Sequence, residues 1–172
     1  MGYQDKEFEN KNFQNLNFTN EDFSSSKFID CTFENCNLSN IKLTDTRFQS
    51  VLFKSCKLLG LDFTKANKLI LTPKFEDSLI LTCNFSDLNL KETTFLNCQI
   101  HDSDFTNSNL SKCNFENSNL RGSIFQNSNL SQASFKNANE YDINPANNFL
   151  RKTKFSLPDA VSLLRAFDIE LD

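Results

Sequence analysis

The sequence is poor in the residues that bend a chain and in those that carry out catalysis. Its 172 residues include three glycines, three prolines, one histidine and no tryptophan. So little glycine and proline excludes a collagen-like chain and a flexible linker. No stretch approaches the ~18 consecutive apolar residues of a membrane-spanning helix, and the polar start MGYQDKEFENKNF lacks the apolar run of a signal peptide. We therefore expect a cytoplasmic protein that does not interact with membranes.

An excess of charge is also missing, because 22 acidic residues are nearly balanced by 18 basic ones. A protein that binds nucleic acid directly is normally basic, so direct binding to nucleic acid is not expected. The sequence has no G-x-S-x-G, P-loop or G-x-G-x-x-G motif. Its single histidine, His101, lies beside Asp102 and Asp104 at a position expected to face solvent. We predict no enzyme activity, no catalytic or metal site, no cofactor and no small-molecule substrate.

A period of five residues is what the sequence does contain. In the stretch CNFENSNLRGSIFQNSNLSQASF, residues 113–135, a large apolar residue occupies every fifth position. Steps of five spread side chains around a helix, which turns every ~3.6 residues, and place them on alternating faces of a strand. Neither element can bury this pattern on one side, so the backbone must bend once in every five residues.

The period extends over most of the chain. It is unbroken over residues 3–63, resumes two residues out of phase at Ile70, and continues to 155 with degenerate repeats at 139–149. The phase shift predicts a small loop within 64–69. Such self-similarity is typical of a solenoid, whose units bury their apolar faces against their neighbours. Residues 1–155 are therefore predicted to form one repeat domain.

The residue two positions before each large apolar residue, which we call the −2 position, is usually small. All six cysteines occupy this position: Cys31, Cys36, Cys56, Cys83, Cys98 and Cys113. A small inward side chain leaves room for its bulky neighbour, so we interpret the cysteines as packing residues. Two positions after the large residue, asparagine is frequent, as at Asn97 and Asn107. Asparagine tolerates the left-handed backbone of tight corners.

These features together resemble the pentapeptide repeat family, whose repeat follows the pattern A-[DN]-[LF]-x-x. The sequence NSNLS at 107–111 and 127–131 is close to the family consensus. The resemblance implies an all-β solenoid, a right-handed, four-sided (quadrilateral) β-helix with one pentapeptide on each side. Every fourth repeat then stacks on the same side. The expected core includes Phe85, Phe95, Phe105, Phe115, Phe125 and Phe135, with Leu110, Leu120 and Leu130.

The tripeptide Leu-Ile-Leu occurs at 69–71 and again at 79–81, on either side of the resumed register. If both isoleucines point inward, the leucines point outward. The register places Leu79 and Leu81 on the coil next to Leu59, and contiguous exposed apolar residues often mark contact sites. Two interpretations stay open. These three leucines bind a partner protein, or the expected loop packs over them.

The last segment, SLPDAVSLLRAFDIELD at 156–172, departs from the repeat. Its apolar residues recur at helical spacing, and acids then alternate with apolar residues as in a short strand. A solenoid needs its last coil covered, so a cap is one interpretation. The segment also resembles the end of the quinolone-resistance (Qnr-type) pentapeptide proteins. That resemblance implies an α-helix and a short strand that pair two subunits into a homodimer through Leu163, Leu164, Phe167 and Ile169.

Two non-enzymatic functions are consistent with these features. The Qnr-type resemblance implies a DNA-mimicking rod that binds a type II topoisomerase, DNA gyrase or topoisomerase IV, and protects it from quinolones. The alternative is a structural scaffold or regulatory module with an unrelated protein partner. A DNA mimic displays a negative field. Residues 1–155 contain 18 of the 22 acidic residues and 17 of the 18 basic residues, a net charge of −1. The DNA-mimicking function therefore requires the acids to be sorted onto one side.

Overall fold

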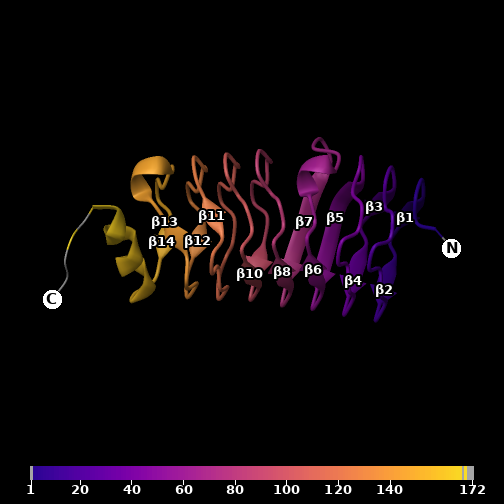
Figure 1. Cartoon of the computed structure of the whole chain (residues 1–172), viewed down its shortest axis with the longest axis horizontal. Coiled ribbons are helices and arrows are strands. Elements are labelled where there is room, and N and C mark those ends of the chain that lie inside the picture. The colour runs from indigo at the N-terminus through magenta and orange to yellow at the C-terminus, as the bar shows by residue number, and fades with distance from the viewer. Residues whose placement is uncertain (1, 168, 170–172) are drawn as a thin grey trace.

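The chain folds into a rod, a β-solenoid of about seven turns that ends in one short helix (Figure 1). The structure, a computed structural model, describes residues 2–167 and 169. Three 3-10 helices are present in these residues: η1 at Phe63–Lys65, η2 at Pro145–Asn147 and η3 at Asp159–Phe167. The strands are β1 Glu7–Glu9, β2 Asn12–Gln14, β3 Lys27–Ile29, β4 Thr32–Glu34, β5 Arg47–Lys54, β6 Lys57–Leu59, β7 Leu71–Glu76, β8 Leu79–Leu81, β9 Phe95–Leu96, β10 Gln99–His101, β11 Ile124–Phe125, β12 Ser134–Phe135, β13 Asp142–Ile143 and β14 Lys154–Phe155.

Successive coils pair in parallel. Phe8 of β1 lies opposite Phe28 of β3, and single bridges continue the same 20-residue register where no strand is long enough to be assigned, as between Asn109 and Asn129. The backbone groups of one coil are satisfied by the next, as where the Phe105 N–H donates to the Ile124 carbonyl at 2.9 Å. Within the described residues, no helix is long and apolar enough to cross a membrane.

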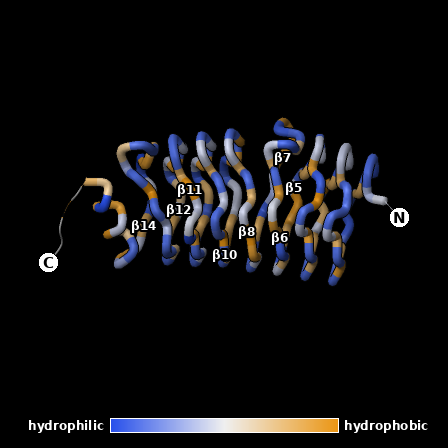
Figure 2. The backbone as a smooth tube through the Cα atoms, viewed as in Figure 1, coloured by the Kyte–Doolittle hydropathy of each residue, from blue (hydrophilic) through white to orange (hydrophobic). Residues whose placement is uncertain are grey.

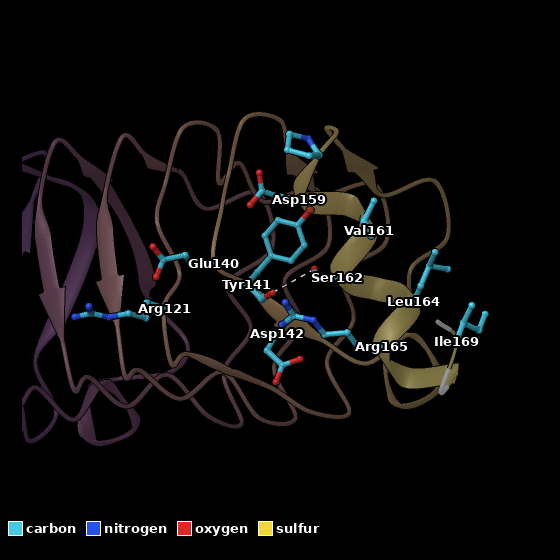
Figure 3. A pocket seen from close by; sticks show the side chains of 11 residues that line it. Arg121, Glu140, Tyr141, Asp142, Asp159, Val161, Ser162, Leu164, Arg165 and Ile169 are labelled. Carbon is cyan, nitrogen blue, oxygen red and sulfur yellow. Dashed lines mark hydrogen bonds between the residues drawn. The ribbon is translucent and has the colours of Figure 1, made fainter. Parts of the chain in front are cut away.

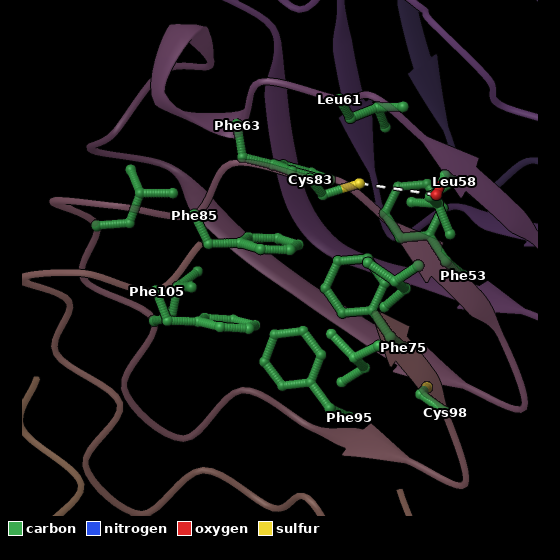
Figure 4. Close-up of a cluster of buried hydrophobic side chains, with 14 of the residues drawn as sticks. Phe53, Leu58, Leu61, Phe63, Phe75, Cys83, Phe85, Phe95, Cys98 and Phe105 are labelled. Atoms are coloured by element: carbon green, nitrogen blue, oxygen red, sulfur yellow. Dashed lines mark hydrogen bonds between the residues drawn. The ribbon is translucent and has the colours of Figure 1, made fainter. Parts of the chain in front are cut away.

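Each coil has four sides, which we name after the buried residues of the coil at 103–122: the Phe105, Leu110, Phe115 and Leu120 sides. Phenylalanine rings stack in columns on two opposite sides. The Phe115 ring lies 5.0 Å from that of Phe95 at an interplanar angle of 1°. The two columns meet edge to face in the core, with the Phe105 and Phe115 centroids 6.0 Å apart at 90°. Figure 4 shows both columns in the middle of the rod.

The residues expected in the core are buried, none being more than 4% exposed. Each such side chain contributes about 1.5–3 kcal/mol relative to exposure. Figure 2 shows the consequence along the rod, where apolar segments recur in every coil between polar ones. The solenoid predicted from the five-residue period, and the four sides implied by the family resemblance, are therefore confirmed.

The corners between sides have left-handed backbone, as the frequent asparagines predicted. Asn97, Asn107 and Asn117 have φ angles of 53°, 58° and 57°. Their side chains also bond from coil to coil. Asn117 Nδ2 donates to Asn97 Oδ1 at 3.0 Å, and Asn97 Nδ2 donates to Asp77 Oδ1 at 3.0 Å. Asparagine therefore provides both the backbone conformation and a link between coils.

The −2 position has a second role that the sequence analysis missed. The Ser118 hydroxyl donates to the Phe95 carbonyl at 2.7 Å and accepts the Cys98 N–H at 2.8 Å. Thiols make the donated bond as well, since Cys113 Sγ donates to the Leu90 carbonyl at 3.0 Å. A signal for this was present, because serine, threonine and cysteine can donate a hydrogen bond and alanine of similar size cannot. The −2 side chains therefore bond each coil to the one before it.

The interruption of the register lies where the phase shift predicted it, but one detail was wrong. Leu71 is buried opposite Phe48, whereas Ile70 is only half-buried. We expected Ile70 to point inward and Leu71 outward. The alternation of β7 brings Leu71, Pro73 and Phe75 to the inside instead, because the strand begins one residue after the expected core position.

The degenerate repeats keep the core closed with residues that the five-residue spacing does not select. Glu140 would be a core residue by spacing, but it adopts a corner conformation with φ of 53° and is exposed. Tyr141 and Ile143 are buried in this coil. Ile143 of β13 lies opposite Phe125 of β11 and so continues the Phe105 side.

The C-terminal helix η3 is a 3-10 helix, not the α-helix that the apolar spacing predicted. Residues three apart in a 3-10 helix lie in one row. Val161, Leu164 and Phe167 form such a row and are 39%, 36% and 56% exposed. Leu163 belongs to a different row and packs against the core. Adjacent residues of a helix point in different directions, so Leu163 packs against the core while Leu164 stays on the surface.

The rest of the tail either differs from the structure expected from the sequence or lies outside the described residues. Ile169 has no regular structure, and the rest of the expected strand lies outside the described residues. The spacing of Ser156 and Asp159 resembles a capping box, but the Ser156 hydroxyl instead accepts the Asn137 N–H at 3.1 Å.

Candidate interaction surfaces

The three leucines proposed as a partner site lie together on the Leu120 side. Leu59 of β6 is directly opposite Leu81 of β8, and Leu79 is opposite Lys57 in the same pair of strands. All three leucines are half-buried. We call Leu59, Leu79 and Leu81 the leucine patch.

The loop at 64–69 does not lie over the leucine patch. Its hydrogen bonds connect it to the preceding coil at the corner before the Leu110 side: the Asn67 N–H donates to the Thr46 carbonyl at 2.9 Å, and Asn67 Nδ2 donates to Asp45 Oδ1 at 2.7 Å. In Figure 1 this loop follows η1 at the top of the rod, whereas β6, β8 and β10 run along the bottom. The interpretation in which this loop covers the leucines is therefore wrong.

His101 continues the column of Leu59 and Leu81 into β10. It is half-buried rather than fully exposed, and its Nδ1 lies 3.5 Å from Arg121 Nη2 on the next coil. No ion pair with Asp102 or Asp104 exists among the described residues. The neighbour of His101 is thus the Arg121 guanidinium. In the described part of the chain, no group of residues could hold a metal ion.

Charged residues are sorted between two neighbouring sides. The Phe105 side, with the 64–69 loop, has eight acidic and three basic residues, a net charge of −5. Its acids are Asp5, Glu21, Asp22, Asp45, Asp62, Asp87, Asp104 and Asp142. The Leu110 side has four acidic and seven basic residues, a net charge of +3. The acids therefore follow one side of the rod, which we call the acidic side.

The six cysteines are buried and unpaired. Burial raises the pKa of the Cys56, Cys98 and Cys113 thiols to about 12 and that of Cys83 to about 11. Cys83 Sγ lies 3.7 Å from the Leu58 carbonyl (Figure 4). A buried, protonated thiol is a poor nucleophile and a poor metal ligand, so these residues act in packing and in coil-to-coil hydrogen bonds.

A hollow of about 580 Å³ separates η3 from the last coil (Figure 3). We call it the tail hollow. Its lining is Arg121, Glu140, Tyr141, Asp142, Pro158, Asp159, Val161, Ser162, Leu164, Arg165 and Ile169. Ser162 Oγ donates to the Tyr141 carbonyl at 3.5 Å, the dashed line of Figure 3. Sequence reasoning did not find this site, because Tyr141 and Glu140 lie in the degenerate repeats.

The outer surface of the tail is apolar. The row of Val161, Leu164 and Phe167 is exposed on η3, and Ile169 after it is also exposed. Of the four residues expected in a dimer interface, three are therefore on the surface of one chain, while Leu163 is packed against the core. An exposed apolar row at the end of a rod is a candidate contact surface.

The chain belongs to the pentapeptide repeat family. A family model described as "Pentapeptide repeat region" matches residues 6–77, and one described as "Pentapeptide repeats (8 copies)" matches 83–122 and 113–139. No curated protein sequence matches the chain at a significant level.

Several solved structures are similar at low sequence identity. Two trypsin-treated variants of QnrB1, which is described as a plasmid-mediated fluoroquinolone resistance protein, are each 16% identical to this chain. The similarity to the first variant covers 99% of this chain and 92% of the variant, with a TM-score of 0.68. The similarity to the second covers 99% of this chain and 93% of the variant, with a TM-score of 0.71. HetL, described as involved in heterocyst differentiation regulation in the cyanobacterium Nostoc sp. strain PCC 7120, is 13% identical over 90% of this chain and 88% of its own, with a TM-score of 0.45. The likeness to QnrB1 shows a shared fold.

Proposed function

We propose that this protein is a non-enzymatic interaction protein, a Qnr-like rod that binds a type II topoisomerase, DNA gyrase or topoisomerase IV, and protects it from quinolones. The observation that carries the proposal is the acidic side. Eight acids aligned along one side of a rod offer a negative surface to a protein groove that normally holds DNA. The full-length likeness of fold to QnrB1, itself described as a fluoroquinolone resistance protein, is consistent with it.

The charge density of the acidic side determines how strongly it attracts a partner and how binding depends on salt. From Asp5 to Asp142 the acidic side crosses about seven coil spacings of ~4.8 Å, about 34 Å. Its net charge of −5 amounts to about one charge per 7 Å, whereas duplex DNA carries one per ~1.7 Å. Electrostatic attraction is therefore several-fold weaker per unit length than that of DNA. We expect binding to decrease as salt is raised, because exposed charges are screened.

The alternative is a structural scaffold or regulatory module with an unrelated protein partner. The leucine patch favours this function, because its half-buried leucines can be desolvated by a protein surface and do not depend on charge. In either case the partner is a protein, and the thiols stay reduced in the cytoplasm, where we place the protein.

We also propose that two chains form a homodimer through the tail. The row of Val161, Leu164 and Phe167, with Ile169, presents apolar surface at the end of the rod. A second copy of the same surface would bury it, as in the two-fold interfaces common among homodimers.

The first test is a DNA gyrase supercoiling assay with added protein, with and without a fluoroquinolone. We expect the protein to change gyrase activity or to reduce inhibition by the drug. The charge variant is Asp62→Asn with Asp104→Asn. Each aspartate accepts the backbone N–H of the residue two positions later. Asparagine can accept the same N–H, as Asn84 does on the coil between Asp62 and Asp104, so the substitutions remove only charge.

The matched control is Asp30→Asn, which removes one acid from the Leu110 side at a left-handed corner. The charge variant should weaken the effect on gyrase and the control should not. A wild-type protein without effect on gyrase or topoisomerase IV at any concentration would contradict the topoisomerase function and leave the unrelated partner as the better explanation.

A further inference from the structure

The tail hollow has the size of a ligand site and contains a polar atom without a partner. Its volume of about 580 Å³ lies within the ~300–1,000 Å³ usual for small-molecule pockets. Tyr141 lines the hollow and is only 3% exposed, yet its hydroxyl has no hydrogen-bond partner in the described part of the chain. By contrast, the buried hydroxyls of Ser118 and Ser128 both donate to carbonyls. A buried hydroxyl without a partner costs free energy, which a ligand could recover.

The hydroxyl is accompanied by a carboxylate. The Tyr141 ring extends from the last coil toward the first turn of η3, where Asp159 lies (Figure 3). Burial, and then the negative charge of Asp159, raise the pKa of Tyr141 to about 12. The hydroxyl is therefore neutral near pH 7, and its oxygen can accept a hydrogen bond from a donor in the hollow.

The charge of the lining favours a cation. Three carboxylates, Glu140, Asp142 and Asp159, face two guanidiniums, Arg121 and Arg165, which leaves the lining at −1. No ion pair within 4.0 Å joins any of these five groups in residues 2–167 and 169. Their charges are thus free to interact with a bound molecule.

The remaining wall is apolar. Val161, Leu164 and Ile169 line the hollow and are exposed to solvent. A ligand that fits both walls has a charged head and an apolar body.

We propose that the tail hollow binds a primary ammonium group carried on an apolar stem. The ammonium donates to the Asp159 carboxylate and to the Tyr141 oxygen, and the stem packs on Val161 and Leu164. Two sources share this chemistry: a free arylalkylamine, and the lysine side chain of another protein. This inference does not depend on topoisomerase binding, because it rests on a different part of the molecule. The stem would use Val161 and Leu164, which the proposed homodimer also uses, so a bound stem and a second copy of the chain compete for these residues.

The test uses tryptamine as the probe. The chain has no tryptophan, so the fluorescence polarisation of the indole reports binding without interference. Tryptophol, which replaces the ammonium by a neutral hydroxyl, is the matched control and should bind at least tenfold more weakly. Competition by Nα-acetyl-lysine methylamide, but not by its Nε-acetylated form, would identify the lysine source. Failure of both to compete would identify the free amine.

Three variants of the full chain test the assigned residues. Tyr141→Phe should weaken tryptamine binding about fivefold while the unliganded protein melts at the same or a higher temperature, because an unpartnered hydroxyl is removed. Asp159→Asn should weaken binding at least tenfold. Arg165→Gln should strengthen it severalfold, since the lining becomes more negative. Tyr3→Phe, at the other end of the rod, should leave binding unchanged.

The opposite outcomes overturn the proposal. Equal binding of tryptamine and tryptophol, or no saturable binding up to millimolar tryptamine, would show that the hollow does not recognise an ammonium. Weaker binding by Arg165→Gln would indicate an anion site. A Tyr141→Phe protein that melts several degrees lower would show that the hydroxyl has a structural partner.

Discussion

The coils are held together, at the scale of single residues, by side chains that are both small and able to donate a hydrogen bond. Size at the −2 position is visible in the sequence, because a large neighbour leaves no room for a larger side chain. The hydrogen bonds are not, since they depend on a carbonyl that lies 23 residues away in the chain. Serine and cysteine can therefore replace one another here, while alanine leaves two backbone groups without a partner.

Replacing Ser118 with alanine should lower the free energy of unfolding by about 1–3 kcal/mol, because the Phe95 carbonyl and the Cys98 N–H would remain buried without their partner. Ser118→Cys should cost less, as a thiol makes the equivalent bond at Cys113. Denaturant unfolding measures both. The control is Ser131→Ala at an outward position; an equal loss there would contradict a specific role for Ser118.

The buried thiols should make the protein less stable at alkaline pH. The folded state holds Cys98 and Cys113 at a pKa of about 12, above the ordinary value of 9.0. The stabilisation that comes from keeping these thiols protonated in the folded state is therefore complete below pH 9. As pH rises from 9 toward 12 it is lost, and the free energy of unfolding falls by about 1.36 kcal/mol per pH unit for each thiol. Cys113→Ser keeps a donor but cannot titrate, so its unfolding free energy should fall less steeply over this range. Parallel curves for the two proteins would contradict this account.

At the scale of elements, backbone conformation decides where corners and strands form more than side-chain chemistry does. Gly122 lies at a corner with φ of +69°, and a Cβ atom there would overlap Asp102 Oδ1 on the preceding coil. Gly122→Ala should lower the free energy of unfolding by about 1–2 kcal/mol, since L residues with a side chain disfavour this conformation. Thermal unfolding measures the loss. Gly2→Ala, where nothing lies within 4 Å, is the control and should be neutral.

The leucine patch is exposed enough to bind a partner and buried enough to contribute to stability. Replacing Leu79 and Leu81 with serine should lower the free energy of unfolding by about 1 kcal/mol, because only part of each side chain is removed from water, and should weaken partner capture. Leu96→Ser has the same half-buried environment on the Phe115 side and should leave capture intact. If the double variant unfolds readily, the leucines are core residues and the patch is not a docking surface.

The five-residue period, at the scale of the whole molecule, was sufficient to predict the solenoid and its core, because one rule repeats and each repeat must bury the same position. It was insufficient where the rule changes. Leu71, Tyr141 and Ile143 are buried out of register, and which residue of a degenerate repeat turns inward depends on where the local strand begins. The tail hollow is formed by such residues, so no spacing argument could locate it. The sorting of acids onto one side needs the exact stacking register, which a two-residue insertion shifts for every later coil.

The assembly of two rods is the last prediction. In η3 the row of Val161, Leu164 and Phe167 is 36–56% exposed and lies outside the core cluster, whereas Leu163 packs against it. Leu164→Arg with Phe167→Arg should therefore give a monomer with an unchanged melting temperature, because charges would enter the dimer interface and not the core. Multi-angle light scattering measures the mass of the variant and of the native chain. Leu157→Arg, an exposed residue outside the row, is the control and should stay dimeric. A native chain that is monomeric at high concentration would rule out the dimer, and a double variant that melts much earlier would show that the row packs within one chain.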